Sequence, residues 1–319
     1  MNGVIKGTGS YLPPRILDNE ELSGMVETSD AWIRERTGVA ARRIAQEETT
    51  AEMAAKAARA AIADAGISPK EIDLILVATI SSNVILPCTA CEVQKEIGAV
   101  CAACFDINTA CTGFLFAYNT AVAYMNAGLC RCALVIGAES LSNLVNWEDR
   151  STCILFGDGA GAAVICAQSG TMGTAVMYSD GAQGGALTCE TRHQKNWERK
   201  PEAAWIRMDG QGVFKFAVRK VPEVIEEVLQ GAGMVKEEIT YYILHQANQR
   251  IVEAVARRLD EPIEKFPMNL SEYGNTSSAS IPILLDEMKK SGRLKRGQKF
   301  ILAGFGAGLS WGATLVNWE

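Results

Sequence analysis

The sequence contains no apolar run long enough to cross a membrane, and its first residues lack the apolar stretch of a signal peptide. It also lacks an excess of positive charge, because 31 Lys and Arg stand against 37 Asp and Glu. The resulting net charge of −6 argues against general binding to nucleic acid. We therefore expect a cytoplasmic protein that acts without a membrane or a nucleic acid, and whose ten cysteines are reduced.

Nucleotide-binding loops are also missing. Gly7-Thr8-Gly9 leads to Pro13-Pro14 and not into the helix that a dinucleotide-binding turn requires, and Gly157–Gly161 lacks the lysine of a P-loop.

Histidine is scarce, since the chain has two. His193 lies in a polar stretch and is interpreted as a surface residue, which leaves His245 as the one histidine to consider for chemistry.

Two cysteine pairs have the spacing of zinc ligands, Cys88 with Cys91 and Cys101 with Cys104. Both pairs lie in alanine-rich sequence without the glycine turns that let thiolates converge. In a strand, Cys101 and Cys104 would also point to opposite faces. We expect neither a metal site nor a bound cofactor.

The sequence that is present predicts an α/β protein. A chain of 319 residues with 48% hydrophobic content is long enough for two domains with a substantial core. Short runs that are apolar on both faces alternate with helices, as expected of central strands covered by helices: Leu74–Val77, Leu134–Ile136 and Phe300–Leu302. The polar segment Gly184–Arg207 breaks this pattern and is interpreted as a loop or hairpin insertion.

An internal repeat indicates two similar halves. Ala65–Val77 resembles Ala232–Leu244, 167 residues later (232 − 65), and each stretch follows an amphipathic helix. Cys111–Gly128 resembles Asn275–Gly292, at an offset of 164 (275 − 111), and each ends in glycine before an apolar strand. Such duplication is typical of two domains related by a pseudo-twofold axis.

The repeat divides the chain into halves 1–168 and 169–319. The offsets make Cys111 and Asn275 equivalent positions that face each other, and they place His245 opposite Ala78. We therefore expect the chemistry to lie where the halves meet.

Cys111 is the candidate nucleophile. It lies between a predicted strand, Ala99–Ile107, and a helix of small residues that runs to about Ala127. A thiol at a helix N-terminus faces unpaired N–H groups and the positive end of the helix dipole, which favour the thiolate. Cysteine is also a common small buried residue, so the position alone leaves that alternative open.

His245 and Asn275 are the candidate partners. His245 follows the strand Tyr241–Leu244, and the carboxyl ends of strands are common sites of catalysis in α/β folds. Each residue has a simpler alternative: His245 could be a hydrogen-bonded core histidine, and Asn275 could be a helix N-cap. Because all three residues stand at the entrances of elements related by the repeat, we favour the functional interpretation.

Five segments together resemble one known family along nearly the whole chain. The family is β-ketoacyl-acyl-carrier-protein synthase III, and the segments follow in its order: Trp32–Gly38, Asn108–Gly113, His245–Asn248, Gly274–Ser277 and Gly306–Gly312. The resemblance implies the thiolase-like fold, a five-layered αβαβα arrangement of two duplicated halves, in a homodimer.

The resemblance also implies a mechanism. The Cys111 thiolate would attack an acyl-CoA thioester and form an acyl-enzyme. The backbone N–H groups of Cys111 and Ala307 would hold the oxyanion; the family usually has glycine at the latter position, and alanine can serve there if its φ is negative. Malonyl-acyl-carrier protein would follow, and His245 with Asn275 would stabilise the enolate formed as CO2 leaves.

The resemblance further implies binding residues. Trp32 and Arg150 would sandwich the CoA adenine, and Arg36 would meet its phosphates. The other residues expected to bind CoA or substrate are Gly210, Phe214 and Asn248 in the pantetheine tunnel and Leu86 as a gate into the partner's acyl pocket. The acidic carrier protein would meet a basic face with Gln246, Arg250, Lys215 and Arg257, although solvent-exposed charge is the ordinary alternative for such residues.

Three rival functions remain open at this stage. A thiolase carries a second cysteine where Asn275 stands, and hydroxymethylglutaryl-CoA synthase relies on a glutamate base. A cysteine hydrolase uses Cys, His and Asn in this chain order but does not need duplicated halves. The third rival is a non-catalytic scaffold of the same fold, which an intact Cys111, His245 and Asn275 set disfavours.

Overall fold

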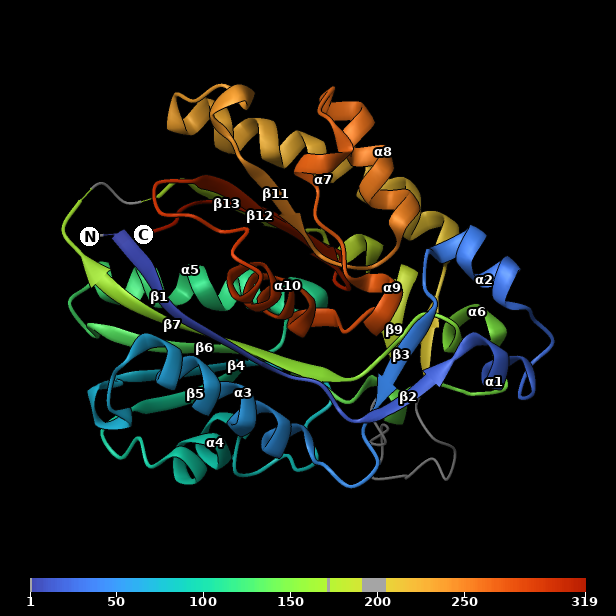
Figure 1. Cartoon of the computed structure of the whole chain (residues 1–319), viewed down its shortest axis with the longest axis horizontal. Coiled ribbons are helices and arrows are strands. Elements are labelled where there is room, and N and C mark those ends of the chain that lie inside the picture. Colours follow the sequence, from blue (N-terminus) through green and yellow to red (C-terminus); the bar gives the residue numbers. More distant parts are fainter. Residues whose placement is uncertain (1, 171–172, 191–204) are drawn as a thin grey trace.

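The protein is described by a computed structural model that covers residues 2–170, 173–190 and 205–319 (Figure 1). Two β-sheets alternate with three layers of helices, so the expected five-layered αβαβα arrangement is confirmed. No helix in the described ranges has the length and apolar character needed to span a membrane.

The first sheet takes all its strands from residues 2–168, in the order β1-β7-β6-β4-β5. β4 runs parallel to β5 and β6, while β7 is antiparallel to β1 and β6. Helices α3 and α4 cover its outer face, where their alanines allow close packing. The bounds are β1 Asn2–Tyr11, α3 Thr50–Ala65, β4 Leu74–Ala78, α4 Thr89–Ile97, β5 Ala103–Ile107, β6 Cys132–Glu139 and β7 Gly159–Gln168.

The second sheet takes its strands from the remainder of the chain, in the order β11-β12-β13-β8. Helices α7 and α8 cover its outer face and pack against each other. The bounds are β8 Ala175–Ser179, α7 Gly210–Ala232, β11 Tyr241–Leu244, α8 Gln249–Leu259, β12 Lys299–Gly306 and β13 Ser310–Asn317.

Helices α5 (Gly113–Asn126) and α10 (Ser280–Lys290) form the middle layer between the two sheets. Their apolar residues share one core with inward-facing residues of both sheets, among them Leu76, Val135 and Leu302. A helix covered on both sides needs little polar surface, which accounts for the apolar sequence of α5.

Smaller elements gather at one end of the five layers (Figure 1). Strands β9 and β10 pair antiparallel, which agrees with the predicted loop or hairpin insertion; residues 191–204 between them, including His193, lie outside the described ranges. The bounds are β2 Arg15–Asp18, α1 Asn19–Ser23, α2 Asp30–Thr37, β3 Ala41–Ile44, α6 Arg150–Cys153, β9 Leu187–Cys189, β10 Ile206–Met208 and α9 Leu270–Tyr273, together with the short 3₁₀ turns η2 Ala110–Thr112 and η8 Ser277–Ala279.

The repeat is present in the structure, but one of its offsets was wrong. Turns η2 and η8 begin 167 residues apart (277 − 110), and so do α5 and α10 (280 − 113). Ala110 and Ser277 both adopt positive φ, at 47° and 49°. The offset of 167 therefore holds for this second segment of the repeat as well, and Cys111 is equivalent to Ser278, not to Asn275.

The strand before Cys111 is shorter than predicted. It starts at Ala103, because Ala99 to Ala102 form a turn after α4, in which Ala102 N–H donates to the Ala99 carbonyl at 3.1 Å. β5 is an edge strand of its sheet, so its outer backbone groups have no partner strand among the residues that the structure describes.

Candidate active site

A cavity of about 550 Å3 lies where the two halves meet and contains all three predicted chemical groups, Cys111, His245 and Asn275. It opens between α2, α6, α7 and α8. Its other lining residues include six of those predicted to bind substrate or carrier protein: Trp32, Arg36, Gly210, Phe214, Asn248 and Arg250.

Cys111 occupies the turn η2, which joins β5 to α5. The positive φ of Ala110 turns the chain sharply at this point, a conformation that costs free energy and is typical of functional sites. On the opposite side, a Cβ placed on Gly306 would come within 2.9 Å of the Cys111 nitrogen. Glycine at 306 is therefore what allows β12 to approach the thiol.

Burial, and not the helix, decides the charge of this thiol. The pKa of Cys111 is raised to about 12 because the side chain is desolvated. Desolvation thus opposes the ionisation that the helix start was expected to favour. At neutral pH the thiol holds its proton and must lose it as it reacts.

His245 follows β11 and is buried, with 2% of its surface exposed. Its Nδ1 lies 2.7 Å from the Ser280 hydroxyl, which also accepts the N–H of Gln246 at 3.3 Å. A ring that accepts from this hydroxyl at Nδ1 carries its hydrogen on Nε2. Burial lowers the pKa of His245 to about 3, which keeps the ring neutral.

Asn275 is held by the backbone on both sides. Its N–H donates to the Leu155 carbonyl at 2.8 Å, and its carbonyl accepts from Gly157 at 3.0 Å. Its side-chain oxygen accepts from the Ser277 N–H at 2.8 Å, which leaves the carboxamide N–H groups to donate to a substrate. Gly274 has a φ of 65°, and a Cβ added to it would lie 2.6 Å from the Leu155 carbonyl oxygen. Glycine therefore allows the chain to pass close to Leu155 at this point.

The proposed oxyanion donors lie side by side. Gly306 contacts Cys111, and Ala307 follows it at the end of β12. The non-glycine residues with positive φ in the described ranges are Ala110, Asp260 and Ser277, so Ala307 meets the condition under which alanine can replace glycine.

The outer part of the cavity carries an aromatic ring between two arginines. The Arg150 guanidinium carbon lies 4.9 Å from the centre of the Trp32 ring, and that of Arg36 lies 5.9 Å from it. Arg150 also donates to the Glu27 carbonyl at 2.8 Å.

Three predicted tunnel residues lie along one wall. Gly210 begins α7, and Phe214 is one turn further along the same helix. Asn248 caps α8 by accepting the Arg250 N–H at 2.8 Å, and its amide donates to the Arg36 carbonyl at 3.1 Å. Asn248 thus joins the start of α8 to the end of α2.

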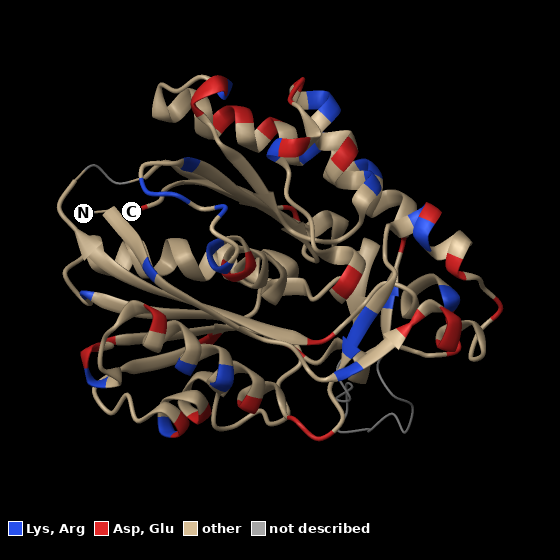
Figure 2. Cartoon of the chain, in the orientation of Figure 1, with Lys and Arg blue, Asp and Glu red and all other residues tan. Residues whose placement is uncertain are grey.

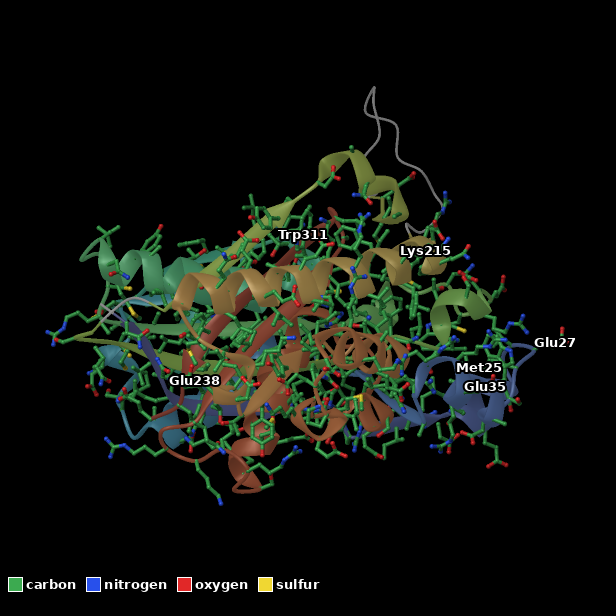
Figure 3. The ribbon with its side chains drawn as sticks, turned by 90° about the horizontal axis from the view of Figure 1, so that it is seen from above. Met25, Glu27, Glu35, Lys215, Glu238 and Trp311 are labelled. Carbon is green, nitrogen blue, oxygen red and sulfur yellow. The ribbon has the colours of Figure 1, made fainter. Side chains whose placement is uncertain are left out.

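Of the predicted docking residues, Arg250, Lys215 and Arg257 are exposed on the neighbouring helices α7 and α8, which carry both basic and acidic residues in Figure 2. Figure 3 labels Lys215 near the start of α7 and Glu35 on α2, toward the same end of the molecule. Gln246 must be withdrawn: it is 1% exposed, and its amide donates to the Leu244 carbonyl at 2.8 Å, so it cannot touch a partner.

Leu86 lies outside the cavity of its own chain. With Ile85 it is among the most exposed large apolar residues, at 85% and 79%. Three of the four cysteines with zinc-like spacing are near one another, since the sulfurs of Cys88 and Cys91 are 3.4 Å apart and the Cys88 sulfur lies 4.0 Å from the Cys104 carbonyl oxygen. In the ranges described, no three His, Cys, Asp or Glu side chains are arranged to hold a metal ion.

The sequence interpretation missed two residues of this site. Ser280 sets the tautomer of His245, and Gly306 makes room for Cys111. Gly306 could have been found from its glycine-rich segment. Ser280 carries no signal before the fold is known, because it is 35 residues from the histidine that it orients.

Comparisons with known proteins agree with this geometry. Residues 105–181 match the family described as 3-oxoacyl-[acyl-carrier-protein] synthase III, and residues 229–318 match the C-terminal part of the same family. The β-ketoacyl-[acyl-carrier-protein] synthase III of Clostridium acetobutylicum is 48% identical over 100% of this chain and 99% of its own length.

Two solved structures have the same fold. The 3-oxoacyl-[acyl-carrier-protein] synthase III of Aquifex aeolicus has a TM-score of 0.93 and 45% identity, and the match covers 99% of this chain and 100% of that one. The corresponding enzyme of Pseudomonas aeruginosa has a TM-score of 0.93 and 37% identity, with 100% and 99% covered. The chain therefore belongs to the β-ketoacyl-[acyl-carrier-protein] synthase III family of condensing acyltransferases.

Proposed function

We propose that this enzyme condenses an acyl-CoA primer with malonyl-acyl-carrier protein and so initiates type II fatty-acid synthesis. The products are 3-oxoacyl-acyl-carrier protein, CoA and CO2. The observation that carries the proposal is the convergence of Cys111, His245 and Asn275 on one cavity whose mouth holds Trp32 and Arg36. The duplicated halves 1–168 and 169–319 contribute the thiol and its two partners respectively.

The first half-reaction forms an acyl-enzyme. The Cys111 sulfur attacks the thioester carbon of the primer, and CoA leaves as a thiolate. The backbone N–H groups of Cys111 and Ala307 stabilise the tetrahedral oxyanion, because they are fixed before the charge develops.

The second half-reaction generates a carbanion. The carboxylate of the malonyl group leaves as CO2, and the electron pair moves onto the thioester as an enolate. Two fixed donors meet the enolate oxygen, the Nε2–H of His245 and the side-chain N–H of Asn275. The carbanion then attacks the acyl-Cys111 thioester and releases the cysteine. These steps require no metal or resident cofactor.

The mouth of the cavity accommodates the two carriers. Trp32, Arg150 and Arg36 supply stacking and positive charge for the CoA nucleotide. Arg250, Lys215 and Arg257 supply a basic face for an acidic carrier protein on an enzyme whose net charge is −6.

A homodimer in the cytoplasm is the assembly that we propose. β5 is an unpaired edge strand, and the nearby Ile85 and Leu86 expose apolar side chains that a partner subunit would cover. In the dimer, Leu86 would reach the partner's acyl pocket, and leucine would leave more room there for longer or branched primers than an aromatic residue.

Mass spectrometry of the protein after incubation with a panel of acyl-CoAs tests the proposal. We expect the acyl group on the peptide that contains Cys111, and the chain-length preference in its yield. Cys111→Ser should abolish acylation, whereas Cys130→Ser, at a buried thiol beyond the far end of α5, should retain it. Acylation of another cysteine in the wild-type protein would contradict the assignment.

A further inference from the structure

Two buried hydroxyls meet beside the nucleophile and have no role in the steps above. Thr112, the residue after Cys111 in η2, is 0% exposed, and Ser310, the first residue of β13, is 3% exposed. Their hydroxyl oxygens are 2.8 Å apart, although 198 residues separate them in the sequence. Thr112 belongs to the first half and Ser310 to the second, so the contact joins the two halves next to Cys111.

Each hydroxyl also contacts a carbonyl of its own turn. Thr112 Oγ1 is 2.7 Å from the Thr109 carbonyl oxygen, and Ser310 Oγ is 3.1 Å from the Ala307 carbonyl oxygen. A separation of 2.8 Å between two hydroxyl oxygens is a hydrogen-bond distance, so one hydrogen lies between them. The other hydrogen is donated to Thr109 or to Ala307, and either arrangement gives two hydrogen bonds in series. We call this pair, Thr112 and Ser310, the hydroxyl bridge.

The hydroxyl bridge lies between the elements that carry the two expected oxyanion donors. The N–H of Cys111 belongs to η2, while that of Ala307 belongs to the connection 307–309 between β12 and β13. Gly306 and Ser310 are the paired residues that close this connection. Because the two donors come from different halves, their separation depends on how η2 packs against β12 and β13.

The neighbouring contact supplies space and not attraction. A Cβ on Gly306 would lie 2.9 Å from the Cys111 nitrogen and 3.0 Å from the Cys111 Cβ. Glycine therefore lets β12 approach the thiol, but it has no side chain that could hold β12 there. An oxyanion hole is effective because its donors are fixed before the charge develops, so a group that fixes their separation is needed.

The connection 307–309 is also held from within its own half. The Leu309 N–H donates to the Asp180 carbonyl at 3.0 Å, and the Asp180 N–H donates to the Leu309 carbonyl at 2.7 Å. These bonds set the shape of the connection. Its position relative to η2 depends instead on contacts between the halves, to which the hydroxyl bridge contributes a hydrogen bond.

We propose that Thr112 and Ser310 are positioning residues that hold the N–H groups of Cys111 and Ala307 at the separation that a tetrahedral oxyanion requires. This inference rests on the proposed function, in which those N–H groups stabilise the oxyanion. Neither hydroxyl-bearing residue lines the cavity, so both act through the backbone that they connect. Their effect belongs to acylation of Cys111 by acyl-CoA and to attack of the carbanion on acyl-Cys111.

Malonyl decarboxylation provides an internal control, because its enolate oxygen meets different donors. His245 follows β11 and Asn275 precedes η8, so neither is part of η2 or of the connection 307–309. Loss of the hydroxyl bridge should therefore spare decarboxylation. A general loosening between the halves would slow both reactions, because Asn275 of the second half is held by the Leu155 carbonyl of the first.

Each hydroxyl can be removed without leaving the other unpaired. In Ser310→Ala, Thr112 can still donate to the Thr109 carbonyl, and in Thr112→Val, Ser310 can still donate to the Ala307 carbonyl. Because the remaining buried hydroxyl keeps a partner, the cost in stability is limited. Thr112→Ser retains the hydroxyl and serves as the conservative variant.

The test is single-turnover acylation of Cys111 at increasing concentrations of acetyl-CoA, with CO2 release from malonyl-acyl-carrier protein measured separately. In Ser310→Ala and in Thr112→Val we expect the maximal acylation rate to fall about 10-fold, less than the loss of about 10²- to 10³-fold that follows removal of an oxyanion donor. The acetyl-CoA concentration at half-maximal rate and the rate of decarboxylation should not change. Thr112→Ser should acylate at close to the wild-type rate.

The double variant Thr112→Val/Ser310→Ala shows whether the two residues act through one contact. If they do, the double variant should be no slower than the slower single variant. Thr50→Val is the matched control. Thr50 is also fully buried, and its hydroxyl lies 2.7 Å from the Ser81 carbonyl and 2.9 Å from the Ser140 hydroxyl, all within the first half. This variant should acylate at the wild-type rate.

Several results would overturn the proposal. They are wild-type acylation rates in both single variants, an equal loss of decarboxylation, losses that multiply in the double variant, or an equal loss in Thr50→Val. Failure of the wild-type enzyme to acylate at Cys111 is a different outcome, which refutes the proposed function and this inference with it.

Discussion

At the scale of single residues, solvent exclusion sets the chemistry of the site more than sequence neighbours do. The Cys111 thiol and the His245 ring are both nearly inaccessible, and burial keeps both neutral. A neutral histidine that donates from Nε2 is suited to stabilise an enolate oxygen rather than to deprotonate a thiol.

This division of labour can be measured. His245→Ala or Asn275→Ala should slow malonyl decarboxylation by about 10²- to 10³-fold, because each removes one fixed donor to the developing oxyanion. Acylation of Cys111 should change far less. Single-turnover measurements of each half-reaction separate the two, and an equal loss in both would identify the histidine as the base of the thiol.

The perturbed pKa values of His245 and Glu139 predict opposite effects of pH on stability. Between pH 6.5 and about 3, the unfolded chain binds a proton at His245 and the folded protein does not. The free energy of unfolding therefore falls as the pH is lowered through this window. Between pH 4.5 and about 7, the buried Glu139 carboxyl stays protonated in the folded protein and is ionised in the unfolded chain. The free energy of unfolding therefore falls as the pH rises through that window.

Glu139→Gln should therefore change the slope of stability against pH. Between pH 4.5 and 6.5 the two effects oppose each other in the wild-type protein, and the variant retains only that of His245. Relative to wild type, its free energy of unfolding should rise by up to about 1.4 kcal/mol per pH unit. Urea denaturation at several pH values measures this, and parallel curves for the two proteins would contradict the raised pKa of Glu139.

At the scale of elements, glycine permits the close contacts that bring the two halves together. β6 passes against η8 at Gly137, where the nearest backbone atom would be 2.2 Å from an added Cβ. β12 passes against η2 at Gly306 in the same manner. Both contacts join an element of one half to an element of the other, next to the active site.

Gly137→Ala should consequently destabilise the protein by about 2 to 4 kcal/mol, because the backbone of η8 must move to relieve the overlap. Gly181→Ala is a matched control, since an added Cβ there meets nothing within 4 Å. Its effect should stay within about 0.5 kcal/mol. Thermal or urea unfolding gives the comparison, and similar effects at both positions would show that η8 yields easily.

At the scale of the whole molecule, the chain is acidic overall, and exposed basic residues of α7 and α8 lie near the cavity. Arg250 lines the mouth of the cavity, while Lys215 lies on the same outer layer without lining it. The structure thus separates two roles that the sequence had grouped. Arg250 can affect both substrates, and Lys215 only the docked carrier protein.

Lys215→Glu should raise the KM for malonyl-acyl-carrier protein several-fold, on the order of the 0.5 to 1 kcal/mol of an exposed charge pair, and leave acylation by acyl-CoA unchanged. The effect should shrink as salt rises, because screening acts over about 10 Å at about 0.1 M ionic strength. Lys70→Glu, on the opposite outer layer, is the control. An unchanged KM at low salt would remove Lys215 from the docking face.

Much of this protein could be predicted from its sequence. The α/β class, the internal repeat and the identities of Cys111, His245 and Asn275 follow from local patterns, because each lies in a short motif at the end of a strand or the start of a helix. The repeat at an offset of 167 was visible in part, and the structure corrects its second segment by aligning η2 with η8.

The tertiary structure alone decided what surrounds those residues. Ser280 comes to the site from a distant part of the chain, and neither sequence spacing nor composition marks it as a partner of His245. Burial of Gln246 likewise removed a residue that its position in the sequence had favoured. The sequence determines which groups are present at each turn, whereas desolvation and hydrogen bonding, which fix their protonation, arise only when the two halves pack together.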